Sequence, residues 1–147
     1  MKLVVQRVKK AKVVRVSDKK TVGEIGLGLF VLVGFKKGDT NEAVKLLADK
    51  LSKLRVMSDD QEKMNKSINE VGGKILVVSQ FTLYADTKGG NRPSFINAEE
   101  PEKAKKLYEY LISKLRELSV DVETGSFGDY MQIEALLDGP VTILFSE

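Results

Sequence analysis

The alternation of apolar and polar residues predicts strands in the first quarter of the chain. From Lys2 to Val16, apolar and β-branched residues recur with a period of about two and one irregularity, which is typical of a long strand. A polar turn at 17–20 and a shorter run over 21–25 predict the returning strand of a hairpin. The run from Leu29 to Phe35 is apolar on both faces and predicts a central strand.

Two later segments have the helical period of about 3.6 residues. The first opens at Asp39, where Glu42 three residues later resembles a capping box. Its apolar positions are Val44, Leu47, Ala48, Leu51 and Leu54. The second opens at Pro101, because proline is favoured at the first helical position. Its apolar positions are Ala104, Leu107, Tyr108, Leu111, Ile112 and Leu115.

Further strands complete the pattern. A polar loop over 59–69 precedes Lys74–Tyr84, which has the strongest strand signal in the chain. Three strand-like runs follow the second helix, at 120–123, 130–137 and 141–145. The sum predicts an α+β fold in a single domain over 1–147: a mostly antiparallel, curled or barrel-like β-sheet with two amphipathic helices packed on it.

The composition limits the available chemistry. The chain of 147 residues has a net charge of +3 and contains neither cysteine nor histidine, so disulfides, thiolate catalysis and zinc sites built on Cys or His are excluded. No stretch approaches the roughly 20 apolar residues of a membrane span. The N-terminus alternates instead of forming the apolar block of a signal peptide. We therefore expect a cytoplasmic protein without a membrane partner, and we expect no metal or cofactor.

The end of the strand at 74–84 carries polar side chains. Strand alternation puts Ser79, Phe81 and Leu83 on one face and Gln80, Thr82 and Tyr84 on the other. Such side chains form either a small hydrogen-bonding site or the end of a strand that emerges into solvent, and the local pattern favours the second. A lone Ser or Thr without His, Cys or a Lys partner is a poor nucleophile.

Two other stretches allow a functional and a plain interpretation. Lys88 and Arg92 lie on a glycine-rich loop that is suited to phosphate contacts, although most basic surface loops are only solvated. Gly139-Pro140 interrupts an apolar run near the C-terminus, and local chemistry favours a simple turn there.

Taken in order along the chain, these segments resemble the D-aminoacyl-tRNA deacylase family. The main matches are Ser79-Gln80-Phe81-Thr82-Leu83 and Gly139-Pro140-Val141-Thr142. Supporting matches are Val5-Gln6-Arg7-Val8, Gly23-Glu24-Ile25-Gly26, Lys63-Met64-Asn65, Arg92-Pro93-Ser94-Phe95 and Met131-Gln132. The chain departs from the family at Leu137, where the family often has Asn, so no role is expected for that side chain.

The resemblance implies a homodimeric hydrolase that cleaves the ester between a D-amino acid, or mischarged glycine, and the 3′-terminal adenosine of tRNA. Correctly charged L-aminoacyl-tRNAs are left intact, and the ribose 2′-OH assists hydrolysis. By resemblance, the catalytic residues are Ser79, Gln80, Phe81 and Thr82. An older proposal in the family makes the threonine a nucleophile.

The resemblance also implies how chirality is read. Gly139-Pro140 forms a cis peptide supplied by the partner subunit, and its two carbonyls capture the substrate's α-amino group. Arg7 holds this peptide in position, and Thr142 and Met131 support the site. Lys88 and Arg92 are the expected tRNA contacts. Two other classes stay open: a non-catalytic RNA- or nucleotide-binding β domain, and a structural dimer module in which Gly-Pro is only a turn.

Overall fold

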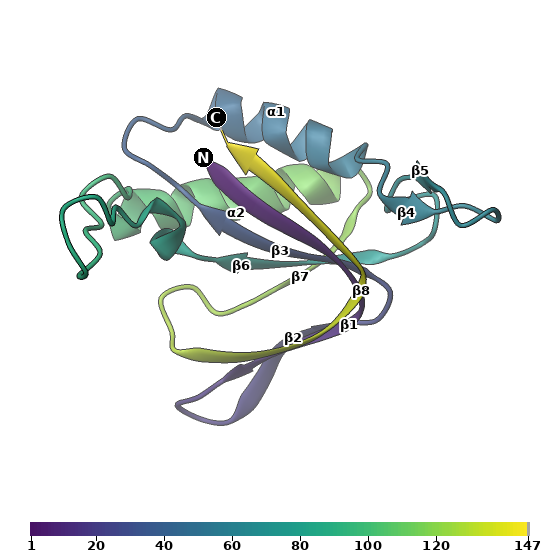
Figure 1. The fold of residues 1–147 in the computed structure, drawn as a ribbon, viewed down its shortest axis with the longest axis horizontal. Helices are drawn as coiled ribbons and strands as arrows, with labels where there is room; N and C mark the ends of the chain where they lie inside the picture. Colours follow the sequence, from purple (N-terminus) through teal and green to yellow (C-terminus); the bar gives the residue numbers. More distant parts are fainter. Residues whose placement is uncertain (147) are drawn as a thin grey trace.

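The computed structural model describes residues 1–146, and Figure 1 shows their arrangement. Within them, the strands are β1 (Lys2–Arg15), β2 (Lys20–Ile25), β3 (Gly28–Gly34), β4 (Met57–Ser58), β5 (Met64–Lys66), β6 (Lys74–Ser79), β7 (Asp121–Thr124) and β8 (Met131–Ser146). The helices are α1 (Asn41–Ser52), α2 (Pro101–Glu117) and the short 3-10 helix η1 (Phe81–Tyr84). No helix in this part of the chain is long and apolar enough to cross a membrane.

β1 is the strand on which the main sheet is built. β8 pairs antiparallel with it from end to end, while β3 pairs with its first half and β2 with its second half. The sheet continues from β3 to β6 and from β6 to β7 through parallel pairings. Parallel neighbours need a long crossover, and α1 and α2 lie within these two connections.

The sheet curls until its two ends approach each other. Gly23 of β2 lies so close to the Thr124 carbonyl of β7 that a Cβ at position 23 would overlap it. Only a glycine fits where the backbones come this close. The curled, barrel-like sheet and its two helices confirm the predicted α+β fold, in which all pairings of β1 are antiparallel.

A buried core lies on each face of the sheet. α1 and α2 cover one face (Figure 1), where Leu47 and Leu51 of α1 and Leu111 and Leu115 of α2 pack against sheet residues. A smaller core lies on the opposite face, inside the curl. It consists of Val8, Ala11, Val13, Ile25, Phe30, Leu76 and Val78. The predicted central position of β3 is confirmed, and its two apolar faces serve these two cores.

The start of α1 differs from the predicted capping box. Thr40 is the N-cap residue, and its hydroxyl accepts a hydrogen bond from the Ala43 N–H (3.3 Å). Asp39 is buried and bonds instead to the α-ammonium group of Met1 (2.9 Å) and the Lys36 N–H (2.8 Å). A buried ammonium group needs a charged partner, so the Asp39 carboxylate pairs with Met1 and does not cap the helix.

Two strand predictions are wrong in ways that shape the site. The segment Lys74–Tyr84 is not one strand, because β6 ends at Ser79 and the chain turns into η1. The runs 130–137 and 141–145 are not separate strands joined by a turn, because both pair with β1 and form the single strand β8. The predicted loop at 59–69 contains β5, which forms a small hairpin with β4.

Candidate active site

The predicted catalytic segment lies at the carboxyl end of β6. Ser79 is the last residue of β6, and the Gln80 N–H donates to the Val33 carbonyl of β3 (2.7 Å). The chain then turns, and the Leu83 N–H donates to the Gln80 carbonyl (3.3 Å) within η1. Because η1 is helical, the predicted sorting of these side chains onto two faces of a strand is wrong.

Gln80 and Thr82 form a polar pair at the start of η1. The Gln80 Nε2 donates a short hydrogen bond to the Thr82 Oγ1. A hydroxyl oxygen that accepts an amide hydrogen is a weaker nucleophile, and the chain has no histidine to take its proton. This geometry is suited to orienting a polar group rather than to nucleophilic attack by Thr82.

Phe81 projects into solvent from η1. The residue is 56% exposed, and the Phe81 and Phe95 rings pack in a T-shaped arrangement with ring centroids 5.1 Å apart. Edge-to-face contacts stabilise aromatic pairs, so Phe95 helps to fix the orientation of the exposed Phe81 ring. Phe95 was not predicted as a site residue, although it lies in the Arg92–Phe95 stretch that carries the family resemblance.

Met131, at the start of β8, lies beside the same end of β6. Its Sδ accepts a hydrogen bond from the Ser126 N–H (3.2 Å). Met131 and Val78 also crowd the same side of Gly125, where a Cβ would lie 3.0 Å from the Met131 sulfur. Val78 directly precedes Ser79, so the structure brings Met131 close to the predicted catalytic segment.

Gly139 and Pro140 lie in a wide bulge of β8. The β1–β8 register shifts there, so that the four residues 138–141 lie opposite the single residue Arg7. A bulge explains how the strand tolerates a proline, which has no N–H for the ladder. The Gly139–Pro140 peptide is cis, as the resemblance predicts, and Gly139 has a φ of +132°.

Arg7 connects this bulge to the segment around β4. Its Nε donates to the Asp138 carbonyl (3.2 Å) and lies 3.2 Å from the Asp138 Oδ2. Its Nη1 donates to the Val56 carbonyl (2.9 Å) and to the Ser58 Oγ (3.2 Å). The side chain is only 11% exposed. This geometry fits the supporting role that the resemblance implies for Arg7.

Within one chain, the predicted catalytic segment and the bulge lie apart. Both contact β1. At its start, the Lys2 Nζ donates to the Leu83 carbonyl of η1 (3.1 Å), and further along the strand Arg7 contacts the bulge. Arg7 lies five residue steps along the extended strand from Lys2, which corresponds to about 17 Å. Thr142 lies on the bulge side, where its hydroxyl accepts from the Gln6 Nε2 (3.4 Å).

Lys2 was not predicted at the site, and the sequence carries no direct signal for it. Its bond to Leu83 joins residues that are 81 positions apart. Alternation along β1 indicates which face Lys2 occupies, but not which segment will cover that face.

Lys88 and Arg92 lie on the loop that follows η1. An antiparallel bridge between Asp86 and Ser94 closes this loop, with backbone bonds of 2.8 and 2.9 Å. The Asp86 carboxylate also accepts from the Lys88 N–H (2.9 Å). Both cationic side chains are exposed on this loop, which directly follows the catalytic segment, and their contact with phosphate stays a prediction.

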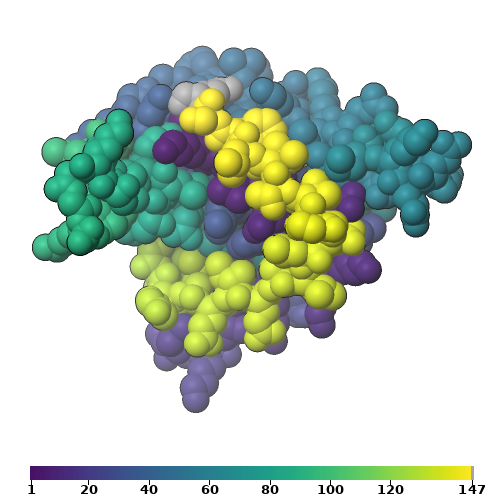
Figure 2. All heavy atoms as spheres, in the orientation of Figure 1, coloured from purple at the N-terminus to yellow at the C-terminus, as the bar shows by residue number. Residues whose placement is uncertain are grey.

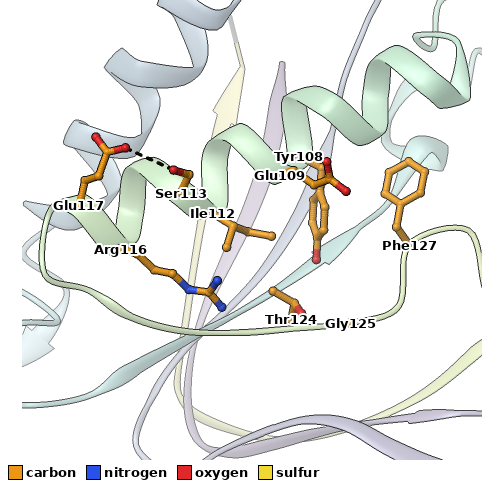
Figure 3. Close-up of a pocket in the computed structure, with 9 residues that line it drawn as sticks. All are labelled: Tyr108, Glu109, Ile112, Ser113, Arg116, Glu117, Thr124, Gly125 and Phe127. Carbon is orange, nitrogen blue, oxygen red and sulfur yellow. Dashed lines mark hydrogen bonds between the residues drawn. The ribbon is translucent and has the colours of Figure 1, made fainter.

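A separate cavity lies between α2 and the segment that follows β7 (Figure 3). It is lined by Tyr108, Glu109, Ile112, Ser113, Arg116, Glu117, Thr124, Gly125 and Phe127. The Tyr108 hydroxyl donates to the Val77 carbonyl of β6 (2.7 Å), and burial raises the pKa of this tyrosine. None of the residues predicted for the site lines this cavity.

The fold and the two motif segments define a class: α+β domains with a curled sheet and a polar site at the end of a buried strand. The chain belongs to the D-Tyr-tRNA(Tyr) deacylase family, whose model matches residues 4–146. It is 53% identical over 144 residues to the D-aminoacyl-tRNA deacylase of Shouchella clausii (strain KSM-K16), covering 98% of this chain and 97% of that protein. The family resemblance is therefore confirmed.

Solved structures share the fold. The c-Myc DNA Unwinding Element Binding Protein superposes with a TM-score of 0.92 at 36% identity, covering 100% of this chain and 99% of that one. A probable eukaryotic D-amino acid tRNA deacylase superposes with a TM-score of 0.82 over 98% and 97% of the two chains. The second is 20% identical, so it supports the fold alone.

Proposed function

We propose that this protein hydrolyses the ester bond between a D-amino acid and the 3′-terminal adenosine of tRNA, releasing the free D-amino acid and tRNA. Family membership over nearly the whole chain carries this proposal. The exposed segment Gln80–Thr82, at the end of a buried strand, supplies the site. Aminoacyl-tRNAs are used in translation, so we propose that the protein acts in the cytoplasm.

The chemistry requires little from the protein beyond orientation. An aminoacyl ester is already activated, and water adds to its carbonyl before the bond to the ribose oxygen breaks. We propose that the neighbouring ribose 2′-OH assists this step, because the chain has no histidine and the Thr82 hydroxyl accepts from Gln80. Positioning and stabilisation of the oxyanion then supply the rate enhancement.

We propose that Gly139-Pro140 of a second copy completes each site. The bulge lies about 17 Å along β1 from the end that contacts η1, which is too far for both to hold one α-amino group. Carbonyls fixed in that place would accept hydrogen bonds from the amino group and leave no room for an L side chain. A D side chain would point outward, and glycine, which has no side chain, would also be hydrolysed.

The surface of β8 supports the homodimer that this arrangement needs. β8 pairs only with β1 in the described part of the chain, and its C-terminal segment crosses the molecular surface (yellow in Figure 2). Leu136 is 49% exposed, Leu137 45% and Leu144 72%. A long apolar edge strand favours association, and a second copy would cover it. Leu137, which departs from the family's usual Asn, lies on this surface.

Release of amino acid from matched substrates tests the proposal. Purified protein should release D-tyrosine from D-Tyr-tRNA, leave L-Tyr-tRNA intact and release glycine from mischarged Gly-tRNA. Replacing the terminal adenosine by its 2′-deoxy form should abolish most of the rate. Equal hydrolysis of the D and L esters would contradict the chirality filter.

A Thr82→Ala variant separates the two proposals for Thr82. If Thr82 positions substrate or water, the variant should be slower but still turn over, and no acyl-enzyme should form. An aminoacyl ester found on Thr82 by mass spectrometry would restore the nucleophile mechanism.

Nucleic-acid binding without catalysis is the second candidate function. One structural relative at 36% identity is named for binding a DNA unwinding element, and this chain carries a net charge of +3. Binding of D-Tyr-tRNA and L-Tyr-tRNA with equal affinity and without release of either amino acid would favour this candidate.

A further inference from the structure

Gly34, the last residue of β3, lies directly against the catalytic segment. A Cβ on Gly34 would lie 2.8 Å from the Gln80 carbonyl oxygen, 3.1 Å from the Leu83 Cβ and 3.4 Å from the Tyr84 Cδ2. These three atoms lie on both sides of Phe81 and Thr82 in the sequence. Gly34 does not have a positive φ, so a lack of space, rather than backbone conformation, requires glycine here.

Lys2 holds the same segment from the neighbouring strand. In the antiparallel β1–β3 register, Lys2 lies opposite Gly34, so both positions face η1. The Lys2 Nζ donates to the Leu83 carbonyl (3.1 Å) and lies 4.9 Å from the centre of the Tyr84 ring. Because Gly34 has no side chain, η1 can lie close enough to the sheet for this contact.

We infer that the Lys2–Gly34 pair is a positioning element that sets the distance of η1 from the sheet, and through it the place of Gln80 and Thr82. Gly34 fixes how closely η1 approaches the sheet, and Lys2 fixes the C-terminal end of η1 at Leu83. Neither residue needs to touch the substrate. The contacts come from β1 and β3, which contribute buried residues to both cores. Close-packed interiors yield little, so a change at either position should move η1 rather than the sheet.

The kinetic consequence rests on the proposed function. An alanine at position 34 has to push the Gln80 carbonyl away, because no side-chain rotation relieves a contact with backbone. A displacement approaching 1 Å costs up to about 100-fold in rate, so we expect kcat to fall by at least ~10-fold. The KM for tRNA should change much less than kcat, because the Asp86–Ser94 bridge closes the basic loop independently of η1 and no atom of β8 is among those that the added Cβ would meet.

Gly26→Ala is the matched control for Gly34→Ala. Gly26 has no atom within 4 Å of the position that a Cβ would take, so its substitution adds the same methyl group without a contact. Both variants and the wild type would be compared for kcat and KM on D-Tyr-tRNA. Amide chemical shifts in a two-dimensional NMR spectrum would report the position of residues 80–84 independently of activity.

Lys2→Met and Lys2→Arg provide a second pair of variants if Gly34→Ala does not fold. The methionine removes the donor to Leu83 and should lower kcat with KM unchanged, and the arginine should restore most of the rate. If Lys2 instead binds tRNA phosphate, the methionine would raise KM in a salt-dependent way, which would overturn the inference for Lys2.

The outcomes separate this inference from the proposed function. Shifted amides at residues 80–84 and a lower kcat in Gly34→Ala, with Gly26→Ala like the wild type, support the positioning role. Unshifted amides with a normal kcat overturn it. If the wild type releases no D-tyrosine, the proposed function fails, while the amide shifts still decide whether Gly34 positions η1.

Discussion

η1 and the Gly139–Pro140 bulge both interrupt a strand, but their own chain holds them to different degrees. η1 rests on β3 at Gly34 and is bonded by Lys2, so it is fixed to the sheet beneath it. The bulge is held on one side by Arg7, and Gly139 and Pro140 are exposed. This difference fits the proposed site, in which η1 is held within one subunit and the bulge of a second copy completes the site.

The largest expected effect comes from releasing the bulge. Arg7→Met removes the donor to the Asp138 and Val56 carbonyls. We expect kcat/KM on D-Tyr-tRNA to fall by about 100-fold, because the bulge loses its anchor. The free energy of unfolding should fall by about 1–3 kcal/mol as these partly buried acceptors lose a partner. Chemical denaturation and steady-state kinetics measure the two effects.

Lys9→Met is the control for the loss of charge near Asp138. The Lys9 Nζ lies 4.0 Å from the Asp138 Oδ1, but its side chain is 66% exposed, so this pair contributes little. Activity and stability should stay close to those of the wild type. Equal losses in the Lys9 and Arg7 variants would contradict a specific anchor.

A smaller effect is expected from Gly139→Ala. The residue has a φ of +132°, and a Cβ would lie 2.8 Å from the Val141 nitrogen. The bulge must rearrange, so activity should fall on the order of tenfold. Stability should fall by about 1–3 kcal/mol, the usual cost of such a backbone conformation.

Gly128→Ala separates backbone cost from displacement of the bulge. Gly128 also has a positive φ (+81°), but nothing lies within 4 Å of its added Cβ. The two variants should therefore lose similar stability, whereas only Gly139→Ala should lose activity. Loss of activity in both would mean that general destabilisation explains the result.

The basic loop should affect binding rather than selectivity. Neutralising Lys88 and Arg92 together should weaken tRNA binding. The slope of the logarithm of the binding constant against the logarithm of the salt concentration should become shallower by roughly 0.7 for each lost contact to a single-stranded phosphate. The preference for D over L esters should not change, because this loop is separate from the bulge. Unchanged binding at low salt would show that the loop is only a solvated surface.

The smallest effect is expected at Tyr84, which tests whether η1 is held by packing. The Tyr84 hydroxyl is buried without a hydrogen-bond partner among the described residues. Burial first, and the Asp39 charge second, raise the pKa of Tyr84 from 10.0 to about 12. Because the pKa of Tyr84 is higher in the folded than in the unfolded protein, the neutral hydroxyl favours the folded state. This contribution to the free energy of unfolding is complete below pH 10 and is lost as the pH rises through about 12.

Tyr84→Phe should therefore leave stability at pH 7 unchanged and remove part of the alkaline loss. Denaturation curves at pH 7 and between pH 10 and 12 measure this difference. A clear loss of stability at pH 7 would show that the hydroxyl has a partner in solution.

Much of the fold follows from periodicity, whereas the shape of the site does not. The amphipathic helices and β3 were predictable because burial imposes a regular pattern on their residues. Local chemistry at Gly139-Pro140 predicts a turn, but pairing of both flanks with β1 makes it a bulge. A residue's long-range strand partner is not encoded in its neighbours.

The predicted catalytic segment shows the same limit of sequence-based prediction. Its sequence alternates like a strand through Tyr84, yet the helical turn begins after Ser79. The cause is tertiary, because Gly34 and Lys2 provide a place for η1 beside β3. The residue types of the site were predictable from the family motif, but their three-dimensional support was not.

Mixing two defective subunits tests the shared site most directly. One subunit carries Gln80→Ala and Thr82→Ala, and the other carries Gly139→Ala and Pro140→Ala. In a mixed dimer, one site would contain an intact η1 from the second subunit and an intact bulge from the first. The account predicts that co-refolding restores release of D-tyrosine well above either parent. No restoration, with mixed dimers demonstrated by native mass spectrometry, would contradict a site built from two copies.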